Sequence, residues 1–349
     1  MKRLSCGRPI YDHYRQRWWI AQSISTSNQR YPVRAAGDVT MHYALVFSTS
    51  KVKAADQSAS QWLDGLAESF AFLNPQNHAT WLAPNRAAEI TCLASDDLLS
   101  GDILQNRAFL DLRQHADSAG IDVNLVPANN RRKAILIADM DSTIITSESL
   151  DELAISAGIG EQVAAITRRS MAGELDFETA LDERVAMLAG KPKGLIDQII
   201  ANSKLTDGAR ILVQTMRAHG AFCYLVSGGF DVLTGPIAAA CGFHGHHANH
   251  LDHDETTITG TVRKPVLDRQ AKVTYLTHYC QLHDIDLADT ASIGDGANDL
   301  GMLEQAGFGV AFHGKPILRE TVALQLNHTN LTGLLYLQGY TLDEFVCGD

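Results

Sequence analysis

Alternating apolar and polar positions predict a small region of mixed strands and helices near the start of the chain. Short runs rich in apolar and β-branched residues are typical of strands, and between them apolar residues recur at helical spacing. We expect strands at 42–48, 80–83, 88–94 and 121–126, and helices at 58–72 and 103–119. This β-α-β-β-α-β order is the ferredoxin-like arrangement, so we expect an α+β domain over residues 41–130.

A different pattern begins at residue 134, where unbroken apolar runs alternate with helical patterns. Such runs are typical of strands that are buried on both faces of a parallel sheet. We expect these strands at 134–138, 222–226, 290–293 and 309–312, helices at 206–219 and 268–281, and a hairpin at 248–262. The pattern predicts an α/β core with a Rossmann-like parallel sheet over residues 131–349.

The stretch between the first two core strands contains helical patterns and no convincing strand. It runs from Ser149 to about Ser203 and is interrupted at Gly158 and Gly160. A helical insertion at this point would cover the carboxyl ends of the strands. We therefore expect a cap at about 149–205 that excludes water and selects the substrate.

Polar side chains capable of chemistry follow three of the expected core strands. Asp139 and Asp141 follow the first strand, Ser227 follows the second and Asp295 follows the third. Because ligands bind at the carboxyl ends of parallel strands, we expect these side chains to share one site. Buried carboxylates at i and i+2 are costly unless they hold a cation or take part in catalysis. The alternative for 139–143 is a simple helix N-cap.

Phosphoryl transfer would use each member of this set. Asp139 is the candidate nucleophile and would form an aspartyl-phosphate. Asp141 would protonate the leaving alcohol and then deprotonate water. The segment 227–229 offers a hydroxyl and backbone N–H groups, and Lys272 offers a positive charge. The structural alternatives for the last two are a turn and a solvated helix face.

A second acidic group, made of Asp295, Asn298 and Asp299, lies in one short loop. Its hard oxygen ligands, together with Asp139, would hold Mg²⁺. At ~4 Å and an effective dielectric constant of ~20, two like unit charges repel by about 4 kcal/mol, so a cation helps a carboxylate to approach a phosphate. The alternative is a turn or a calcium loop, but the ligand spacing of an EF-hand is absent.

Four segments together resemble the motifs of the haloacid dehalogenase (HAD) superfamily, and more narrowly those of its phosphoserine phosphatases. They are 139–143 (DMDST), 227–230 (SGGF), Lys272 and 294–299 (GDGAND). The resemblance covers about residues 133–330. It implies a Rossmann-like core with a helical cap, and Mg²⁺-dependent hydrolysis of O-phospho-L-serine to L-serine and phosphate, the last step of serine biosynthesis. The small domain is loosely similar to ACT regulatory domains.

The resemblance also implies individual roles for residues of the core. Asp139 would be the nucleophile and Asp141 the proton donor and acceptor. The metal would be bound by the Asp139 carboxylate, the Asp141 backbone carbonyl and Asp295, with Asp299 supporting them from outside the coordination sphere. The implied substrate contacts are Glu148, Met171, Phe177, Arg184, Ser227, Gly228, Gly229, Lys272 and Asn298.

Two of these residues suit the amino-acid part of phosphoserine. Glu148 is an acid that can receive the amino group, and Arg184 can bind the carboxylate with two parallel hydrogen bonds. A surface ion pair with Asp182 or Glu183 is the alternative for Arg184, but neighbours at those spacings on a helix do not face each other.

Composition narrows the class of protein. The 349 residues are 45% hydrophobic with a formal net charge of −11, which argues against nucleic-acid or anionic-membrane binding. No run approaches the ~18 apolar residues that cross a membrane. Six scattered cysteines without a C-x-x-C pair fit free thiols and a cytoplasmic location. Residues 1–40 carry seven basic and two acidic residues; a transit peptide is one interpretation, but we expect a disordered extension.

Several alternatives stay open. A phosphatase or phosphotransferase for a related amino-acid phosphate, such as phosphohomoserine, is hard to distinguish, because one methylene changes specificity by only ~1–3 kcal/mol. The region 41–130 could instead make the chain an amino-acid sensor, with an effector site or a homodimer contact. Five histidines within 244–253 could suggest zinc, but their spacing matches no common zinc motif, and we expect an exposed turn there.

Overall fold

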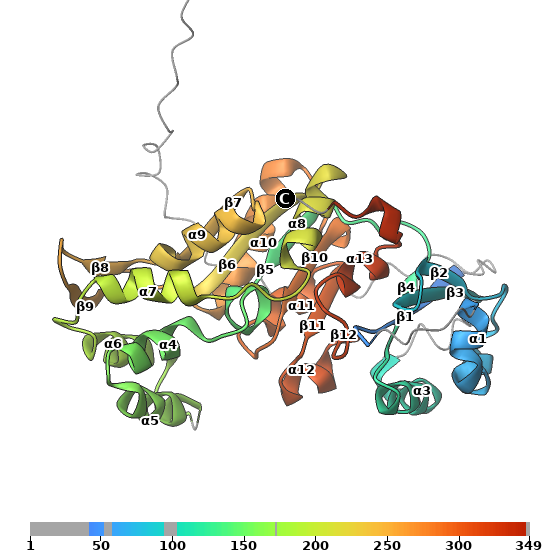
Figure 1. Cartoon of the computed structure of the whole chain (residues 1–349), viewed down its shortest axis with the longest axis horizontal. Coiled ribbons are helices and arrows are strands. Elements are labelled where there is room, and N and C mark those ends of the chain that lie inside the picture. The colour runs from blue at the N-terminus through green and yellow to red at the C-terminus, as the bar shows by residue number, and fades with distance from the viewer. Residues whose placement is uncertain (1–41, 52–57, 94–102, 172, 347–349) are drawn as a thin grey trace, which may run out of the picture. The chain divides into compact units, whose positions relative to one another are not determined.

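The computed structural model describes residues 42–51, 58–93, 103–171 and 173–346 (Figure 1). The extension expected over residues 1–40 lies outside these ranges. Two main sheets are present in the described part, one antiparallel and one parallel. The expected domain boundaries at residues 41–130 and 131–349 stay a prediction.

The first sheet has four antiparallel strands in the order β2-β3-β1-β4. This is the strand order of a ferredoxin-like sheet, as the sequence predicted. Its strands are β1 (His42–Ser48), β2 (Thr80–Ala83), β3 (Ala87–Leu93) and β4 (Asp122–Pro127). Its helices are α1 (Ala59–Leu63), the 3₁₀ segments Asp64–Leu73 and Ile103–Gln105, and α3 (Arg107–Ser118). The helix expected at 58–72 is therefore confirmed, although most of it is a 3₁₀ helix.

Period-2 alternation along β1 divides the core of this region. Leu45 and Phe47 are buried in a cluster with the helices, which includes Phe109 of α3. Ala44 and Val46 point to the opposite face and join the large cluster that continues into the parallel sheet. Both faces of the antiparallel sheet are thus covered, which explains why β1 is apolar at nearly every position.

The second sheet has six parallel strands in the order β12-β11-β10-β5-β6-β7. The four predicted strands are confirmed as β5 (Ile135–Ala138), β6 (Phe222–Phe230), β10 (Thr290–Gly294) and β11 (Phe308–Phe312). The sequence did not reveal β12 (Leu324–Leu326). The strand β7 (Gly245–Asn249) pairs with β6, so the hairpin predicted at 248–262 was placed too early; it consists of β8 (Leu251–His253) and β9 (Ile258–Val262).

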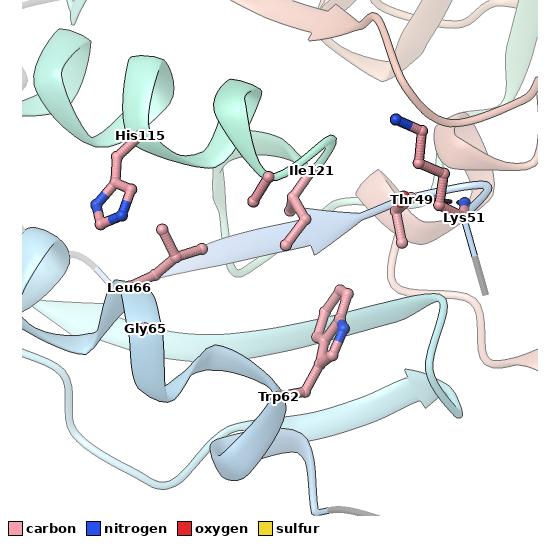
Figure 2. A pocket seen from close by; sticks show the side chains of 8 residues that line it. Thr49, Lys51, Trp62, Gly65, Leu66, His115 and Ile121 are labelled. Atoms are coloured by element: carbon pink, nitrogen blue, oxygen red, sulfur yellow. Dashed lines mark hydrogen bonds between the residues drawn. The ribbon is translucent and has the colours of Figure 1, made fainter. Parts of the chain in front are cut away.

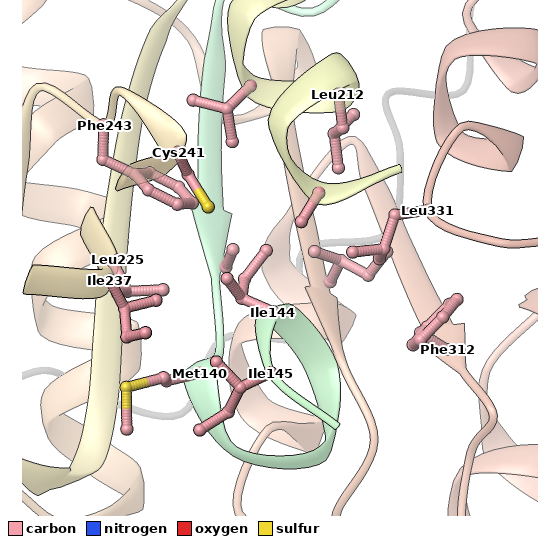
Figure 3. Packing of buried hydrophobic residues seen from close by; sticks show 14 of the residues in the cluster. Met140, Ile144, Ile145, Leu212, Leu225, Ile237, Cys241, Phe243, Phe312 and Leu331 are labelled. Carbon is pink, nitrogen blue, oxygen red and sulfur yellow. The ribbon is translucent and has the colours of Figure 1, made fainter. Parts of the chain in front are cut away.

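The central strand β5 carries alternate side chains to two helical layers. Leu136 and Ala138 belong to the cluster under α8, α9 and α13, whereas Ile135 and Ile137 belong to the cluster under α10, α11 and α12. Figure 3 shows the first of these clusters, with Leu212 and Ile237 packed near the end of β5. The helices are α8 (Ala209–Ala218), α9 (Asp231–Cys241), α10 (Arg269–His283), α11 (Leu300–Gln305), α12 (Pro316–Thr321) and α13 (Gly333–Leu337).

In the described part of the chain, four helices lie between β5 and α8, which confirms the predicted helical insertion. They are α4 (Ser149–Ser156), α5 (Gly160–Met171), α6 (Phe177–Ala186) and α7 (Gly194–Asn202). The hairpin β8–β9 is bound to this insertion, because the N–H of Lys193 donates to the Thr256 carbonyl at 2.8 Å and that of Gly190 to the Ile258 carbonyl at 2.9 Å. The cap therefore combines the insertion with a hairpin from the core.

The prediction of an exposed turn for the histidine-rich segment was wrong in part. His246 and His247 lie in β7 and are half-buried. The His247 ring stacks on Tyr275 at 3.8 Å between centroids, and burial lowers the pKa of His247 to about 4. Among the described residues, the group of side chains with metal-ligand spacing lies elsewhere and contains no histidine.

A membrane-crossing helix would need both length and an apolar composition. Within the described ranges, no helix meets both conditions.

Candidate active site

A pocket of about 900 Å³ opens at the carboxyl edge of the parallel sheet, beneath the cap. Residues of the core and residues of the cap line this pocket together, so they face the same space. The residues predicted for the site that line it are Asp139, Asp141, Glu148, Phe177, Arg184, Ser227, Gly228, Gly229, Asp295 and Asn298.

Asp139 follows β5 directly and is held by the neighbouring strand. Its N–H donates to the Ile293 carbonyl on β10 at 3.0 Å, and the residue as a whole is 3% exposed. The turn that follows, Met140–Ile144, receives no side-chain capping bond from Asp139. Asp139 therefore does not cap this turn with its side chain, and its carboxylate lines the pocket.

Lys272 on α10 lies between two buried carboxylates. Its Nζ is 2.6 Å from Asp139 Oδ1 and also donates to Asp299 Oδ1. Burial lowers the pKa of this ammonium, but the attraction of the two carboxylates outweighs it and the net shift is upward. Two carboxylates sharing one ammonium leave an excess of negative charge, and burial together with Asp299 raises the pKa of Asp139.

Asp141 turns back toward the start of α4. Its Oδ1 accepts the Ser149 N–H at 3.0 Å. Burial is the main reason that its pKa rises to about 6, with a smaller contribution from the charge of Glu148. A carboxyl group with a pKa near 6 can both donate and accept a proton close to neutral pH, as acid–base catalysis requires.

The segment 227–229 continues β6, so the turn that was the alternative interpretation of this segment is not formed. The Gly229 N–H donates to Ser227 Oγ at 2.9 Å. A Cβ on Gly229 would lie 3.1 Å from Asp141 Oδ2 and 3.2 Å from Ser227 Oγ. Only glycine lets the strand pass this close to the carboxylate.

Asn249 is a site-supporting residue that the sequence analysis missed. It is buried, and its Nδ2 donates to the Gly228 carbonyl at 2.9 Å while its Oδ1 accepts the Leu267 N–H at 2.6 Å. These bonds hold the 227–229 segment in place from below. The polar strand GHHAN, which ends in Asn249, was the available signal.

Three carboxylates converge with the spacing of a metal site. Ligand atoms of Asp139, Asp295 and Asp299 lie within 4.8 Å of one another. An all-oxygen, acidic donor set fits Mg²⁺ and offers little to a soft metal. Asp299 is fully buried, and its Oδ2 accepts the Gly296 N–H at 3.0 Å, so it braces the loop that carries Asp295.

The predicted substrate contacts Lys272 and Asn298 differ in their access to the pocket. Asn298 lines the pocket, whereas Lys272 is 1% exposed and lies beneath the floor formed by Asp139. Lys315, which no prediction included, lines the pocket instead, with its Nζ 3.0 Å from Asp295 Oδ2.

The cap contributes the second set of predicted residues. Glu148 Oε1 accepts the Ser142 hydroxyl at 2.9 Å, and Arg184 donates its Nε to the Ala180 carbonyl at 3.0 Å. The Phe177 ring lies over the strand, 3.6 Å from the position that a Cβ on Gly228 would take. The side chain of Met171 lies outside the described part of the structure.

Comparisons with known proteins were made for the sequence and the fold. The family model of haloacid dehalogenase-like hydrolases matches residues 136–304. The chain is 38% identical to a phosphoserine phosphatase from Streptomyces coelicolor over 240 residues, which is 68% of this chain and 58% of that protein. It is 36% identical to a phosphoserine phosphatase from Haemophilus influenzae over 237 residues, which is 67% of this chain and 76% of that protein.

A solved structure resembles both parts of the described chain. It is a HAD family hydrolase from Salmonella enterica serovar Typhi, with a TM-score of 0.74 and 28% identity over 85% of this chain and 98% of that one. The matched part spans less than two thirds of the Streptomyces protein's own length. Sequence, fold and site geometry agree, and the chain belongs to the haloacid dehalogenase-like hydrolase family, alongside relatives named phosphoserine phosphatase.

Proposed function

We propose that this chain is a Mg²⁺-dependent phosphoserine phosphatase that hydrolyses O-phospho-L-serine to L-serine and phosphate, the last step of serine biosynthesis. One observation carries the proposal: the pocket that contains Asp139 and Asp141 also contains Glu148 and Arg184. A nucleophile and an acid therefore share a space with groups for an amine and a carboxylate. The names of the two relatives support the same substrate.

In the first step, a carboxylate oxygen of Asp139 attacks phosphorus. The new O–P bond forms as the bond between phosphorus and the serine oxygen breaks, and Asp141 gives its proton to that oxygen. The pKa of about 6 at Asp141 supports this role, because a fraction of the group is protonated near neutral pH. The products of this step are L-serine and an aspartyl-phosphate on Asp139.

In the second step, Asp141 acts as a base. It removes a proton from water, whose oxygen attacks the phosphorus and releases the Asp139 carboxylate. The Ser227 hydroxyl lines the pocket beside Gly228 and would donate a hydrogen bond to a phosphoryl oxygen. Lys272 keeps the Asp139 oxygen oriented from beneath.

The donor set fits the magnesium ion that the family implies. Asp139 and Asp295 would hold it with the backbone carbonyl of Asp141, and Asp299 would brace the loop. The bound ion would supply positive charge against the phosphoryl group. The upward shift in the pKa of Asp139 supports this need, because burial and Asp299 otherwise oppose its ionised form.

Glu148 and Arg184 would select the amino-acid part of the substrate. Burial lowers the pKa of Arg184, and the nearby carboxylates of Asp151 and Glu148 oppose that shift. The guanidinium therefore lies in an acidic setting, half-buried, where a substrate carboxylate can reach it. Phe177 would line the apolar side of the pocket.

The test measures phosphate release with and without Mg²⁺ from phosphoserine, phosphothreonine, phosphohomoserine and p-nitrophenyl phosphate. A Mg²⁺-dependent preference for phosphoserine is the expected result. Arg184→Ala should raise KM for phosphoserine by about tenfold or more, the value of a charge-assisted pair, and should leave KM for p-nitrophenyl phosphate nearly unchanged. Equal effects on both substrates would contradict the carboxylate contact, and comparable rates on all four would contradict the substrate assignment.

A second pocket supports an effector site in the region 41–130. It measures about 250 Å³ and is lined by polar and aromatic groups. Figure 2 shows Trp62 of α1 and His115 of α3 directed toward this space, with Lys51 at its edge. The ammonium of Lys51 and the aromatic ring of Trp62, which line the same pocket, suit a small amino acid. Calorimetry would measure the binding of such an amino acid to the full chain. No heat with any of the common amino acids would contradict this proposal.

The remaining parts of the proposal concern the setting of the enzyme. We propose that the protein forms a homodimer, that it is located in the cytoplasm, and that its domains span residues 41–130 and 131–349. The free, buried thiols of Cys92, Cys223, Cys241 and Cys280 support a reducing compartment. Sedimentation of the full chain would test the dimer.

A further inference from the structure

Lys315 is a second lysine at the acidic site, and the motifs did not include it. It follows β11 and stands at the N-cap position of α12. Its Nζ lies 3.0 Å from Asp295 Oδ2 and 3.7 Å from Glu148 Oε1. One ammonium thus reaches a carboxylate of the proposed metal site and the carboxylate proposed to bind the substrate amine.

The backbone of Lys315 is held by hydrogen bonds and close packing, whereas its side chain is half-exposed. Its N–H donates to the Asp295 carbonyl at 2.9 Å, and the N–H of His313 donates to the Leu326 carbonyl at 2.8 Å. Gly314 fits tightly, since a Cβ there would lie 3.1 Å from the Cβ of Ala311. Pro316 then begins α12. The loop therefore always presents the base of this side chain to Asp295.

The two lysines of the site differ in their freedom to move. The Lys272 side chain is 1% exposed and is held between Asp139 and Asp299. The Lys315 side chain is 50% exposed. A half-exposed ammonium exchanges carboxylate partners at little cost, because water can solvate it on the way. A buried one cannot.

A divalent cation and the Lys315 ammonium would use the same atoms. Mg²⁺ bound by Asp139 and Asp295 requires an unencumbered oxygen of Asp295, and it would repel a positive charge only 3.0 Å from that carboxylate. Glu148 offers the displaced ammonium a second carboxylate within reach.

We propose that Lys315 is an exchangeable counter-cation of Asp295 that competes with the metal ion and moves toward Glu148 when the metal binds. It is a positioning residue, because it acts on the metal ligands and on the substrate's amine site. By this competition Lys315 lowers the affinity of the site for Mg²⁺. The proposal rests on the proposed function only in taking Asp295 as a metal ligand.

The test is a calorimetric titration of the full chain with Mg²⁺ alone, without any phosphate ester. Lys315→Met keeps the length of the side chain and removes the charge. We expect this variant to bind Mg²⁺ about threefold to fivefold more tightly than the original chain, the upper part of the range for a partly solvated charge pair. Lys315→Arg keeps the charge and should bind Mg²⁺ within about twofold of the original chain.

Lys264→Met is the matched control. Lys264 also joins two carboxylates, with its Nζ 2.8 Å from Glu178 Oε1 and 2.7 Å from Asp182 Oδ2, but this exposed cluster is not part of the metal site. Its loss makes the same change in net charge, so it should leave the Mg²⁺ affinity close to that of the original chain. An equal gain in Lys264→Met would show a general charge effect and would overturn the proposal.

Asp295→Asn tests the metal site separately from the role of Lys315. If this variant loses Mg²⁺ binding while Lys315→Met binds as the original chain does, or more weakly, the metal site stands and the role of Lys315 is overturned. If the original chain binds no Mg²⁺, or Asp295→Asn binds as well as it does, the metal assignment and the Lys315 proposal both fail. Tighter binding by Lys315→Met together with restored affinity in Lys315→Arg supports the proposal.

Discussion

Each of the two sheets buries a carboxylate, Asp122 in the antiparallel sheet and Asp139 at the edge of the parallel sheet. Comparing them distinguishes an acid that stabilises the fold from one that we propose takes part in catalysis. Asp122 begins β4 in the antiparallel sheet and is 4% exposed. It accepts backbone N–H groups from Asn327, His328 and Thr329 at 2.7 to 3.2 Å. Asp139, at the edge of the parallel sheet, is 3% exposed and has Lys272 as its ion-pair partner.

The partners, more than the burial, decide what each acid does. Burial raises the pKa of both groups. The oxygens of Asp122 are occupied by N–H donors of one short segment, so this residue ties β4 to the chain that follows β12. The Asp139 carboxylate still lines the pocket. A buried carboxylate therefore indicates catalysis only when its own fold leaves an oxygen unused.

The largest effect is expected at Asp139. Asp139→Asn removes the charge of the nucleophile and should lower kcat by about 10⁴-fold or more, because an amide cannot form the aspartyl-phosphate. Stability should stay equal or rise, since the change relieves the repulsion between Asp139 and Asp299. Steady-state phosphate release and thermal melting would measure the two effects. Retained turnover would remove Asp139 as the nucleophile.

Asp122 should respond in the opposite way. Asp122→Ala leaves three N–H groups, of which that of Thr329 is buried, without their acceptor and should lower the free energy of unfolding by about 3 kcal/mol. Below the melting temperature, kcat per folded molecule should stay near that of the original chain, since Asp122 does not line the active-site pocket. Urea denaturation followed by kinetics on the folded fraction checks both points.

A matched change sharpens this prediction. Asp117 carries an exposed carboxylate that contacts His328 Nε2 at 2.7 Å, on the same segment. Asp117→Ala should cost less than about 1 kcal/mol, because an exposed pair contributes little. If Asp117→Ala and Asp122→Ala destabilise the protein equally, the buried carboxylate of Asp122 does not stabilise the contact between β4 and the segment after β12.

The position of Asp139 at the pocket could be predicted from the sequence, and the partners of Asp122 could not. Asp139 follows an unbroken apolar run and Asp295 follows a short strand of small and apolar residues, so a local pattern places them at the carboxyl edge of a parallel sheet. Asp122 is also next to an apolar run, but its three donors are about two hundred positions away in the chain. No periodicity reports such a partner.

The same reasoning explains the residues that were missed. Asn249 supports the 227–229 segment through a side-chain bond to the Gly228 carbonyl, and Lys315 reaches Asp295 from a loop after a short strand. Neither residue belongs to a spacing rule. The strand β12 has only three residues, too few to show alternation. The sequence predicted local elements and strand-end chemistry well, whereas long-range polar contacts required the fold.

The smallest effect concerns pH and tests the third buried acid, Asp141. In its contacts Asp141 is intermediate between Asp122 and Asp139, because it accepts one N–H and still faces the pocket. Burial raises its pKa to about 6. The protonated form is needed to release serine, so the rate of phosphoenzyme formation should fall by up to about tenfold for each pH unit above 6. The ionised form is needed for hydrolysis of the phosphoenzyme, so that rate should rise up to pH 6 and then level off. Rapid-quench measurements of the two steps would separate them. With p-nitrophenyl phosphate, whose leaving group needs no proton, formation of the phosphoenzyme should not fall above pH 6; a fall of the same size with both substrates would place the titrating group elsewhere than at Asp141.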